Sequence, residues 1–188
     1  LTGRDKPLND RATEFLINMA SPSLNKFCDL GAGKGELLLR IALARKQEGQ
    51  FVYDHVSGVE LESSNIDAFN TLKTAALQTL DPSVKDRVES IDMREENILH
   101  FKEKNPNTLY FCNNMLMARE SWYGKVENVL QTLLDLKESV LVTTWPLGGS
   151  RRGSYRKLVF NNNITTTVTG RTLRSYNVTL YIYGHYLR

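Results

Sequence analysis

The residues best suited to chemistry stand in one glycine-rich stretch, residues 27–36. An apolar run ends at Asp29, three alternating glycines follow, and Glu36 opens an apolar helix. Alternating glycines allow a tight turn that keeps side chains away from a ligand. A dinucleotide-binding loop would need Gly or Ala where Glu36 stands, because its helix approaches a pyrophosphate. The stretch therefore predicts a turn whose two acids suit a ligand with positive charge and no phosphate. The alternative is a turn that binds nothing.

The segments around this turn predict an α/β domain with a mostly parallel sheet. Apolar residues at helical spacing alternate with short apolar runs, which is the pattern of strand–helix–strand units. The predicted helices are 11–19, 35–45, 63–79 and 122–134, and the predicted strands are 27–29, 55–61, 87–91, 108–112, 139–145, 165–173 and 178–186. The last two strands form an antiparallel hairpin, which completes a seven-stranded sheet.

Polar side chains stand where the predicted strands end. Glu60 ends the second strand, Asp92 follows the third and Asn113 follows the fourth. The carboxyl ends of parallel strands meet at one edge of a sheet, where an acid after the second strand is placed to accept ribose hydroxyls. We therefore expect a nucleoside-binding edge beside the glycine-rich turn. The alternatives are an exposed acid at a helix start for Glu60 and a helix cap for Asp92.

The composition is that of a folded domain. The 188 residues are 41% hydrophobic and 24% charged, which is ordinary for a globular protein. No run approaches the roughly 20 apolar residues of a membrane span, so we expect no membrane contact. No spacing of zinc ligands occurs, and the two cysteines are expected as small core residues. We expect residues 1–26 to form a helical segment that flanks the predicted ligand-binding cleft and residues 27–188 to form the domain that binds the ligand.

Charge is distributed unevenly along the chain. The formal net charge is +3, yet no acidic residue follows Glu138, whereas seven basic residues do. The densest group defines a predicted basic face, which comprises Arg151, Arg152, Arg156 and Lys157. One-sided charge favours a polyanionic partner such as nucleic acid or a nucleosome surface. A solvated surface with scattered arginines is the alternative.

The sequence Asp-Leu-Gly-Ala-Gly-Lys-Gly at 29–35 resembles motif I of the class I S-adenosylmethionine-dependent methyltransferases. S-adenosyl-L-methionine carries an ammonium and a sulfonium but no phosphate, which agrees with acids at both ends of the turn. The resemblance implies methyl transfer that leaves S-adenosyl-L-homocysteine. It also implies a set of cofactor-binding residues, which comprises Asp29, Gly31, Gly33, Gly35, Glu36, Glu60, Asp92, Met93 and Asn113.

The chain is similar, more narrowly, to the non-SET histone lysine methyltransferases, the disruptor-of-telomeric-silencing class. The similarity rests on the turn together with Gly58-Val59-Glu60, Asp92-Met93, Phe111-Cys112-Asn113-Asn114 and Thr143-Thr144-Trp145-Pro146. In that family the first Asn after strand four borders the channel for the acceptor lysine. The resemblance thus implies the catalytic residues Asn113, Tyr181 and Tyr183, and the channel residues Met115, Met117 and Trp145. Two methionines stand where the family has aromatic residues.

These resemblances imply a nuclear enzyme that methylates a histone lysine in nucleosomes, with the basic C-terminal third contacting DNA or an acidic histone surface. A lysine must lose its proton before it can attack, and an apolar channel lowers its pKa. Asn113 and the two methionines would align the amine, unless the methionines only pack in the core. Two other functions stay open: an RNA or small-molecule methyltransferase of the same fold, and an inactive methyltransferase-like docking subunit.

Overall fold

The computed structural model describes residues 8, 10–115, 117–148, 155–160, 167–168, 171–172 and 178–184. The helices are α1 (Asp10–Asn18), α2 (Glu36–Leu43), α3 (Ser63–Thr79), α4 (Pro82–Glu89) and α5 (Tyr123–Leu133), with 3-10 turns η1 (Ile98–His100) and η2 (Met117–Arg119). The strands are β1 (Lys26–Leu30), β2 (His55–Glu60), β3 (Asp92–Glu95), β4 (Thr108–Cys112), β5 (Val140–Thr143), β6 (Tyr155–Phe160), β7 (Thr167–Val168), β8 (Arg171–Thr172) and β9 (Val178–Tyr183).

Seven strands form one sheet in the order β3-β2-β1-β4-β5-β9-β6, and β7 and β8 form a separate pair. The first five strands in this order, from β3 to β5, are all parallel to one another. β9 lies between β5 and β6 and is antiparallel to both. The order reverses at β1, because β2 lies on one side of it and β4 on the other. Such a switch point, at the carboxyl ends of the strands, is where α/β sheets bind ligands. The predicted sheet, mostly parallel with antiparallel C-terminal strands, is confirmed.

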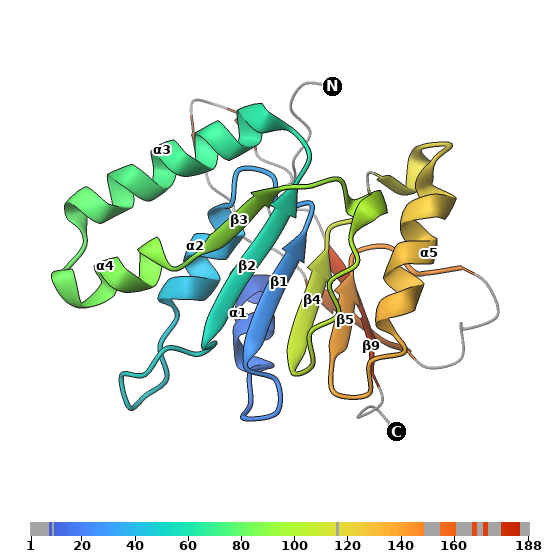
Figure 1. Cartoon of the computed structure of the whole chain (residues 1–188), viewed down its shortest axis with the longest axis horizontal. Coiled ribbons are helices and arrows are strands. Elements are labelled where there is room, and N and C mark those ends of the chain that lie inside the picture. Colours follow the sequence, from blue (N-terminus) through green and yellow to red (C-terminus); the bar gives the residue numbers. More distant parts are fainter. Residues whose placement is uncertain are drawn as a thin grey trace.

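Helices cover both faces of the sheet (Figure 1). On one face α1, α2, α3 and α4 pack over β1 and β4 through a cluster that includes Leu16, Leu38, Ile41, Phe69, Val88, Phe27 and Phe111. On the other face α5 and η1 pack through a cluster that includes Val126, Leu130, Leu133, Ile98, Leu30 and Tyr110. β1 and β4 lie between the two clusters, which explains why both are continuous apolar runs in the sequence.

Arg87 of α4 fixes the position of α2, the helix that follows the glycine-rich turn. Its guanidinium donates hydrogen bonds to the carbonyl oxygens of Ala42 at 3.1 Å, Tyr53 at 2.5 Å and Asp54 at 2.7 Å. The carbonyl of Ala42 belongs to the last turn of α2, where helices have no internal donors. Arg87 therefore ties the end of α2 to the segment that leads into β2.

The predicted strand at residues 87–91 is wrong. Most of it belongs to α4, and β3 begins only at Asp92. α4 starts with a proline at its first position, and the Asp81 carboxylate caps it by accepting a hydrogen bond from the Ser83 N–H at 2.8 Å. This N-cap and proline pair favours a helix start over a strand.

The predicted strand at 165–173 is also wrong. Within the described residues this stretch contains only the short β7 and β8 pair. The strand that pairs with β9 is β6, with Leu158 opposite Leu180 at the centre of the ladder. The C-terminal antiparallel pair therefore exists, but its first strand lies earlier in the chain than predicted.

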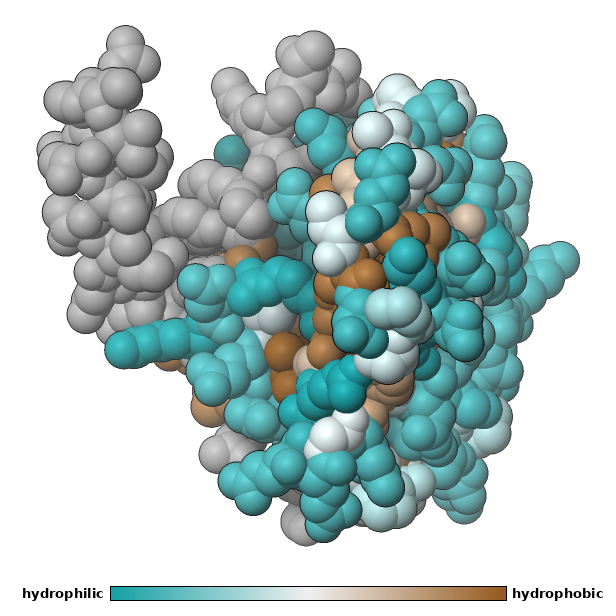
Figure 2. All heavy atoms as spheres, turned by 90° about the vertical axis from the view of Figure 1, so that its left-hand side faces the viewer, coloured by the Kyte–Doolittle hydropathy of each residue, from teal (hydrophilic) through white to brown (hydrophobic). Residues whose placement is uncertain are grey.

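Figure 2 shows the face that carries α3 and α4, which is mainly hydrophilic with a narrow central band of hydrophobic atoms. The composition of α3 agrees with this view, because Phe69 is its buried side chain and Leu72 is 37% exposed. Across the described ranges, no helix combines the length and the apolar character that a bilayer crossing requires.

Candidate functional site

The turn between β1 and α2 needs glycine at three positions. The φ angle is 85° at Gly31, 55° at Gly33 and 72° at Gly35, a region that other residues rarely adopt. A Cβ atom on Gly35 would also overlap the ring of Phe69 in α3, and one on Gly31 would lie 3.0 Å from Cε of Met117. The turn is therefore held closely between α3 and the segment after β4.

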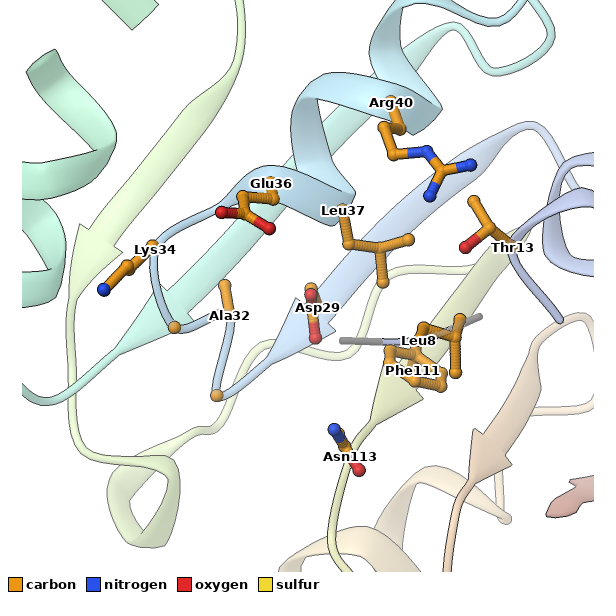
Figure 3. Close-up of a pocket in the computed structure, with 12 residues that line it drawn as sticks. Leu8, Thr13, Asp29, Ala32, Lys34, Glu36, Leu37, Arg40, Phe111 and Asn113 are labelled. Atoms are coloured by element: carbon orange, nitrogen blue, oxygen red, sulfur yellow. The ribbon is translucent and has the colours of Figure 1, made fainter. Parts of the chain in front are cut away.

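A cavity of about 330 Å³ lies between this turn, α1, α2 and the end of β4. Such a volume is within the range of small-molecule sites. Figure 3 shows how the turn and the first two turns of α2 border one side and how Phe111 and Asn113 border the other. Of the predicted cofactor residues, the cavity is lined by Asp29, Gly31, Gly33, Glu36 and Asn113.

Asp29 is the buried acid of this cavity. Its side chain is 3% exposed, and its Oδ1 atom has no hydrogen-bond partner among the described residues. Burial, together with the nearby charge of Glu60, raises the pKa of Asp29 to about 8. A buried carboxyl group without a partner is costly, so its position in a cavity points to a ligand that supplies a donor or a positive charge.

Glu60 fastens the turn to the end of β2. Its Oε2 atom accepts a hydrogen bond from the Gly33 N–H at 2.7 Å, and its Oε1 atom accepts from the N–H groups of Leu61 and Glu62, each at 2.9 Å. The carboxylate is buried but lies outside the lining of the cavity. Because Oε2 accepts one bond, it keeps an acceptor position for a further donor. Ribose binding by Glu60 stays a prediction.

Asn113 and Asn114, at the end of β4, have different surroundings. Asn114 is fully buried; its Oδ1 atom accepts from the N–H groups of Thr144 at 3.1 Å and Trp145 at 2.8 Å. Its Nδ2 atom donates to the Tyr123 hydroxyl at 2.7 Å. Asn114 therefore joins the ends of β4 and β5 to the start of α5 and has a structural role.

The side chain of Asn113 lines the cavity. Its Oδ1 atom accepts a hydrogen bond from the Thr144 hydroxyl at 2.8 Å, and that hydroxyl in turn accepts from the Met115 N–H at 3.1 Å. The Asn113 amide nitrogen thus points away from Thr144 and toward the side of Asp29 in Figure 3. An amide N–H₂ group held in this way can donate to a ligand atom in the cavity.

Asp92 and Met93 do not lie at the carboxyl end of the third strand, where the prediction put them. They are the first two residues of β3 and pair with Ser57 and Gly58, well before the end of β2. Met93 packs against the core cluster on the α1 and α2 face. The shift of β3 along the chain places Glu95 at the carboxyl end instead, opposite Glu60.

Tyr181 and Tyr183 lie on the opposite face of the sheet from the cavity. β9 pairs Tyr181 with Thr143 and Tyr183 with Leu141, and both side chains belong to the α5 cluster. Asp29 and Phe111, which line the cavity, project from the other face. Tyr183 is 3% exposed, and its hydroxyl accepts a hydrogen bond from the Leu147 N–H at 2.8 Å. Neither tyrosine lines this cavity, and their catalytic role stays a prediction.

The predicted channel residues lie along the ends of β4 and β5. Met117 packs over Gly31 of the turn, and Met115 is half-buried with its N–H bonded to Thr144. The indole of Trp145 is 47% exposed, although its backbone is held by Asn114. None of these three residues lines the cavity, so their contact with an acceptor stays a prediction.

The predicted basic face falls mainly outside the described residues. Arg151 and Arg152 lie outside them, and Arg156 is described only as backbone of β6. Lys157 is exposed on β6, with its Nζ 6.0 Å from the centre of the Tyr181 ring. The described residues hold no group of three or more His, Cys, Asp or Glu side chains that suits a metal ion.

Several cavity residues were missed in the sequence. Leu8 and Thr13 approach from the N-terminal segment, and Leu37 and Arg40 come from α2. Arg40 could have been found, because it lies three residues after Leu37 and four after Glu36, which makes it a helical neighbour of both. Thr13 and Leu8 carry no such pattern, since only the packing of α1 brings them to the turn.

Comparison of the sequence with protein-family models and with curated proteins finds no match. Several solved methyltransferase structures are similar in fold. Precorrin-6y C5,15-methyltransferase from Geobacter metallireducens GS-15 has a TM-score of 0.54 at 12% identity, over 97% of this chain and 91% of that one. The methyltransferase domain of bacterial CtHen1 has a TM-score of 0.54 at 9% identity, over 86% and 91%.

A third structure, the CcbJ methyltransferase from Streptomyces caelestis, has a TM-score of 0.53 at 16% identity. The match covers 87% of this chain but 60% of that one, so this chain spans less than two thirds of that enzyme. Together with the strand order, these similarities show that the chain has the class I methyltransferase fold. The predicted fold class is confirmed.

Proposed function

We propose that the chain is an S-adenosylmethionine-dependent methyltransferase that binds its cofactor in the cavity beside the glycine-rich turn. The observation that carries this proposal is the buried Asp29 carboxyl group, which lines the cavity with one oxygen unpartnered. S-adenosylmethionine, when bound, supplies a methyl group on a sulfonium, and S-adenosylhomocysteine remains after transfer. Its α-ammonium group fits the missing partner of Asp29.

The turn supports the same assignment. Two of its left-handed glycines, Gly31 and Gly33, line the cavity and present only backbone to it. The acid at its end, Glu36, would repel a phosphate but suits a cationic ligand. Glu60 holds the turn through the Gly33 N–H at the edge where ribose hydroxyls would lie. These residues bind and orient the cofactor, and they offer no site for a pyrophosphate.

For the acceptor, we infer the ε-amine of a lysine in a histone. Asn113 lines the cavity with its amide nitrogen directed inward, so it can align a polar group near the methyl carbon. The amine must arrive neutral, and half-buried Met115 and Met117 near the end of β4 offer apolar surroundings that lower its pKa. The cofactor would supply the methyl group to the neutral amine that these residues hold, and the proton lost by the lysine would pass to solvent. Catalysis would rest mainly on positioning.

A nucleosome as substrate is supported by charge. The last fifty residues contain basic residues and no acidic ones, which favours a polyanionic partner. An enzyme that acts on nucleosomes would work in the nucleus. Binding through phosphate contacts weakens steeply with salt. Charge reversal at Arg151 and Arg152 should therefore weaken binding to nucleosomes while sparing cofactor affinity.

Two other functions remain alternatives. The fold alone does not fix the acceptor, and one of the similar structures is named for a precorrin substrate, so an RNA or small-molecule acceptor is the second candidate. A docking subunit without turnover is the third. The described residues show no feature that favours either over the histone acceptor.

The proposal is tested by transfer of a radiolabelled methyl group to nucleosomes, free histones and total RNA in parallel. Label in histone supports the lysine acceptor, and label in RNA alone overturns it in favour of the second candidate. Cofactor binding without any label would favour the docking subunit. Asn113→Ala should lower turnover at least tenfold more than it lowers cofactor affinity. An equal loss of both would exclude Asn113 from the acceptor site.

A further inference from the structure

Arg40 lies at the end of the cavity that faces α1. It is one of the residues that line the cavity, and it belongs to the second turn of α2. Its Nη2 atom forms an ion pair with Oδ1 of Asp10, the first residue of α1, at 2.8 Å. Figure 3 shows the guanidinium beyond Leu37, directed toward Thr13.

The charges around the cavity are ordered along its length. Lys34 and Glu36 belong to the turn and the start of α2, Asp29 lies in the middle, and Arg40 lies toward α1. In Figure 3 the Lys34 side chain points away from Asp29, at the side of the cavity opposite Arg40. Arg40 is therefore the cation that a ligand extending from the turn toward α1 would meet.

We infer that Arg40 binds the α-carboxylate of the cofactor, and that Asp10 holds its guanidinium in place for this task. The inference rests on the proposed function, because it assigns the remaining charged group of S-adenosylmethionine. With the ammonium at Asp29, the two acids at 29 and 36 repel the carboxylate toward the α1 end. The pair Asp29 and Arg40 then recognises an α-amino acid by its two opposite charges.

The geometry of arginine allows it to serve both partners. A guanidinium has five N–H donors in a planar fork, and the contact with Asp10 uses one nitrogen. Among the described residues the structure gives Arg40 no second ion-pair partner. The remaining donors can bind a carboxylate without loss of the Asp10 contact, so cofactor binding would also fix the first turn of α1 against α2.

The test measures calorimetrically the binding of two compounds, S-adenosylmethionine and decarboxylated S-adenosylmethionine, which lacks only the carboxylate. We expect Arg40→Met to weaken binding of S-adenosylmethionine about tenfold, as for the loss of a charge-assisted hydrogen bond. Binding of the decarboxylated compound should change less than about twofold. Arg40→Lys, which keeps the charge but not the fork, should recover part of the preference.

Arg45→Met is the matched control, because it removes the same charge from an exposed position outside the cavity. It should leave the affinities for both compounds within about twofold of wild type. An equal weakening of both compounds by Arg40→Met would overturn the inference and indicate a structural role. No change for either compound would overturn it as well, while leaving the proposed function intact. Wild-type protein that binds neither compound would instead overturn the proposed function.

Discussion

Replacing Asp29 by asparagine should stabilise the ligand-free chain at alkaline pH. The carboxyl group is buried, and its pKa is raised from the ordinary 3.8 to about 8, first by burial and then by the charge of Glu60. In the unfolded chain this group loses its proton near pH 4, whereas in the folded chain it keeps the proton until about pH 8. Between these values the folded state binds more protons, so folding stability falls as pH rises.

The size of the effect follows from the two pKa values. Each pKa unit corresponds to about 1.36 kcal/mol, so the gap from 3.8 to about 8 corresponds to roughly 6 kcal/mol above pH 8. The asparagine amide would still be buried with incomplete hydrogen bonding, which costs about 2 kcal/mol. We therefore expect Asp29→Asn to raise the free energy of unfolding by roughly 4 kcal/mol at pH 9. Below pH 4 the variant should have no advantage.

The assay is urea unfolding, followed by circular dichroism, of wild type and Asp29→Asn at pH 4, 6 and 9. Asp67→Asn is the matched control, because Asp67 is exposed on α3 and its replacement should change stability by less than about 0.5 kcal/mol. The same Asp29→Asn variant should lose affinity for S-adenosylhomocysteine, since it removes the partner of the ammonium. A variant that is less stable than wild type at pH 9 would refute the reasoning, because it would show that the Asp29 carboxylate has a stabilising partner.

Three further substitutions test how the site is held, each by urea unfolding. Gly35→Ala should lower the free energy of unfolding by about 3 kcal/mol, because the alanine must adopt a left-handed backbone conformation and its Cβ atom overlaps the ring of Phe69. A loss under 1 kcal/mol would contradict this close packing. Asn114→Ala should also lower the free energy of unfolding by about 3 kcal/mol, because it leaves the buried N–H groups of Thr144 and Trp145 without an acceptor. Unchanged stability would argue against the linking role of Asn114. Arg87→Met should cost roughly 2 kcal/mol through three lost carbonyl contacts, and a stabilised variant would refute that role.

Much of the fold was predictable from local patterns. The predicted helix 63–79 and the predicted strand 108–112 coincide with α3 and β4, because a clear apolar periodicity and a bounded apolar run define them. The strand predicted at 87–91 failed because its apolar residues fit both a strand and the end of a helix. The cap at Asp81 decides between them in favour of the helix.

The site was predictable where it depends on one turn. Asp29 and Asn113 both line the cavity, since each lies at or after the carboxyl end of a central parallel strand at the switch point; their binding roles stay predictions. The face of the sheet that Tyr181 and Tyr183 occupy was not predictable, because alternation shows that they share a face but not which one. Only the antiparallel register of β9 against β5 decides that, and it depends on contacts between distant segments.

Arg40 shows a different limit of sequence analysis. Its helical position next to Glu36 and Leu37 is visible in the sequence, but its partner Asp10 lies thirty residues earlier. Neither residue stands in a motif, and only the packing of α1 against α2 brings them together at the cavity. Long-range ion pairs of this kind require the tertiary structure.

The most direct test of cofactor binding at the glycine-rich turn is a calorimetric titration of wild type and Gly33→Arg with S-adenosylhomocysteine. We predict that wild type binds one molecule per chain and that Gly33→Arg shows no binding, because an arginine at a φ of 55° would occupy the cavity. Circular dichroism of the variant should confirm that it stays folded. Unchanged affinity in folded Gly33→Arg would place any cofactor elsewhere, and a wild type that does not bind would contradict the account.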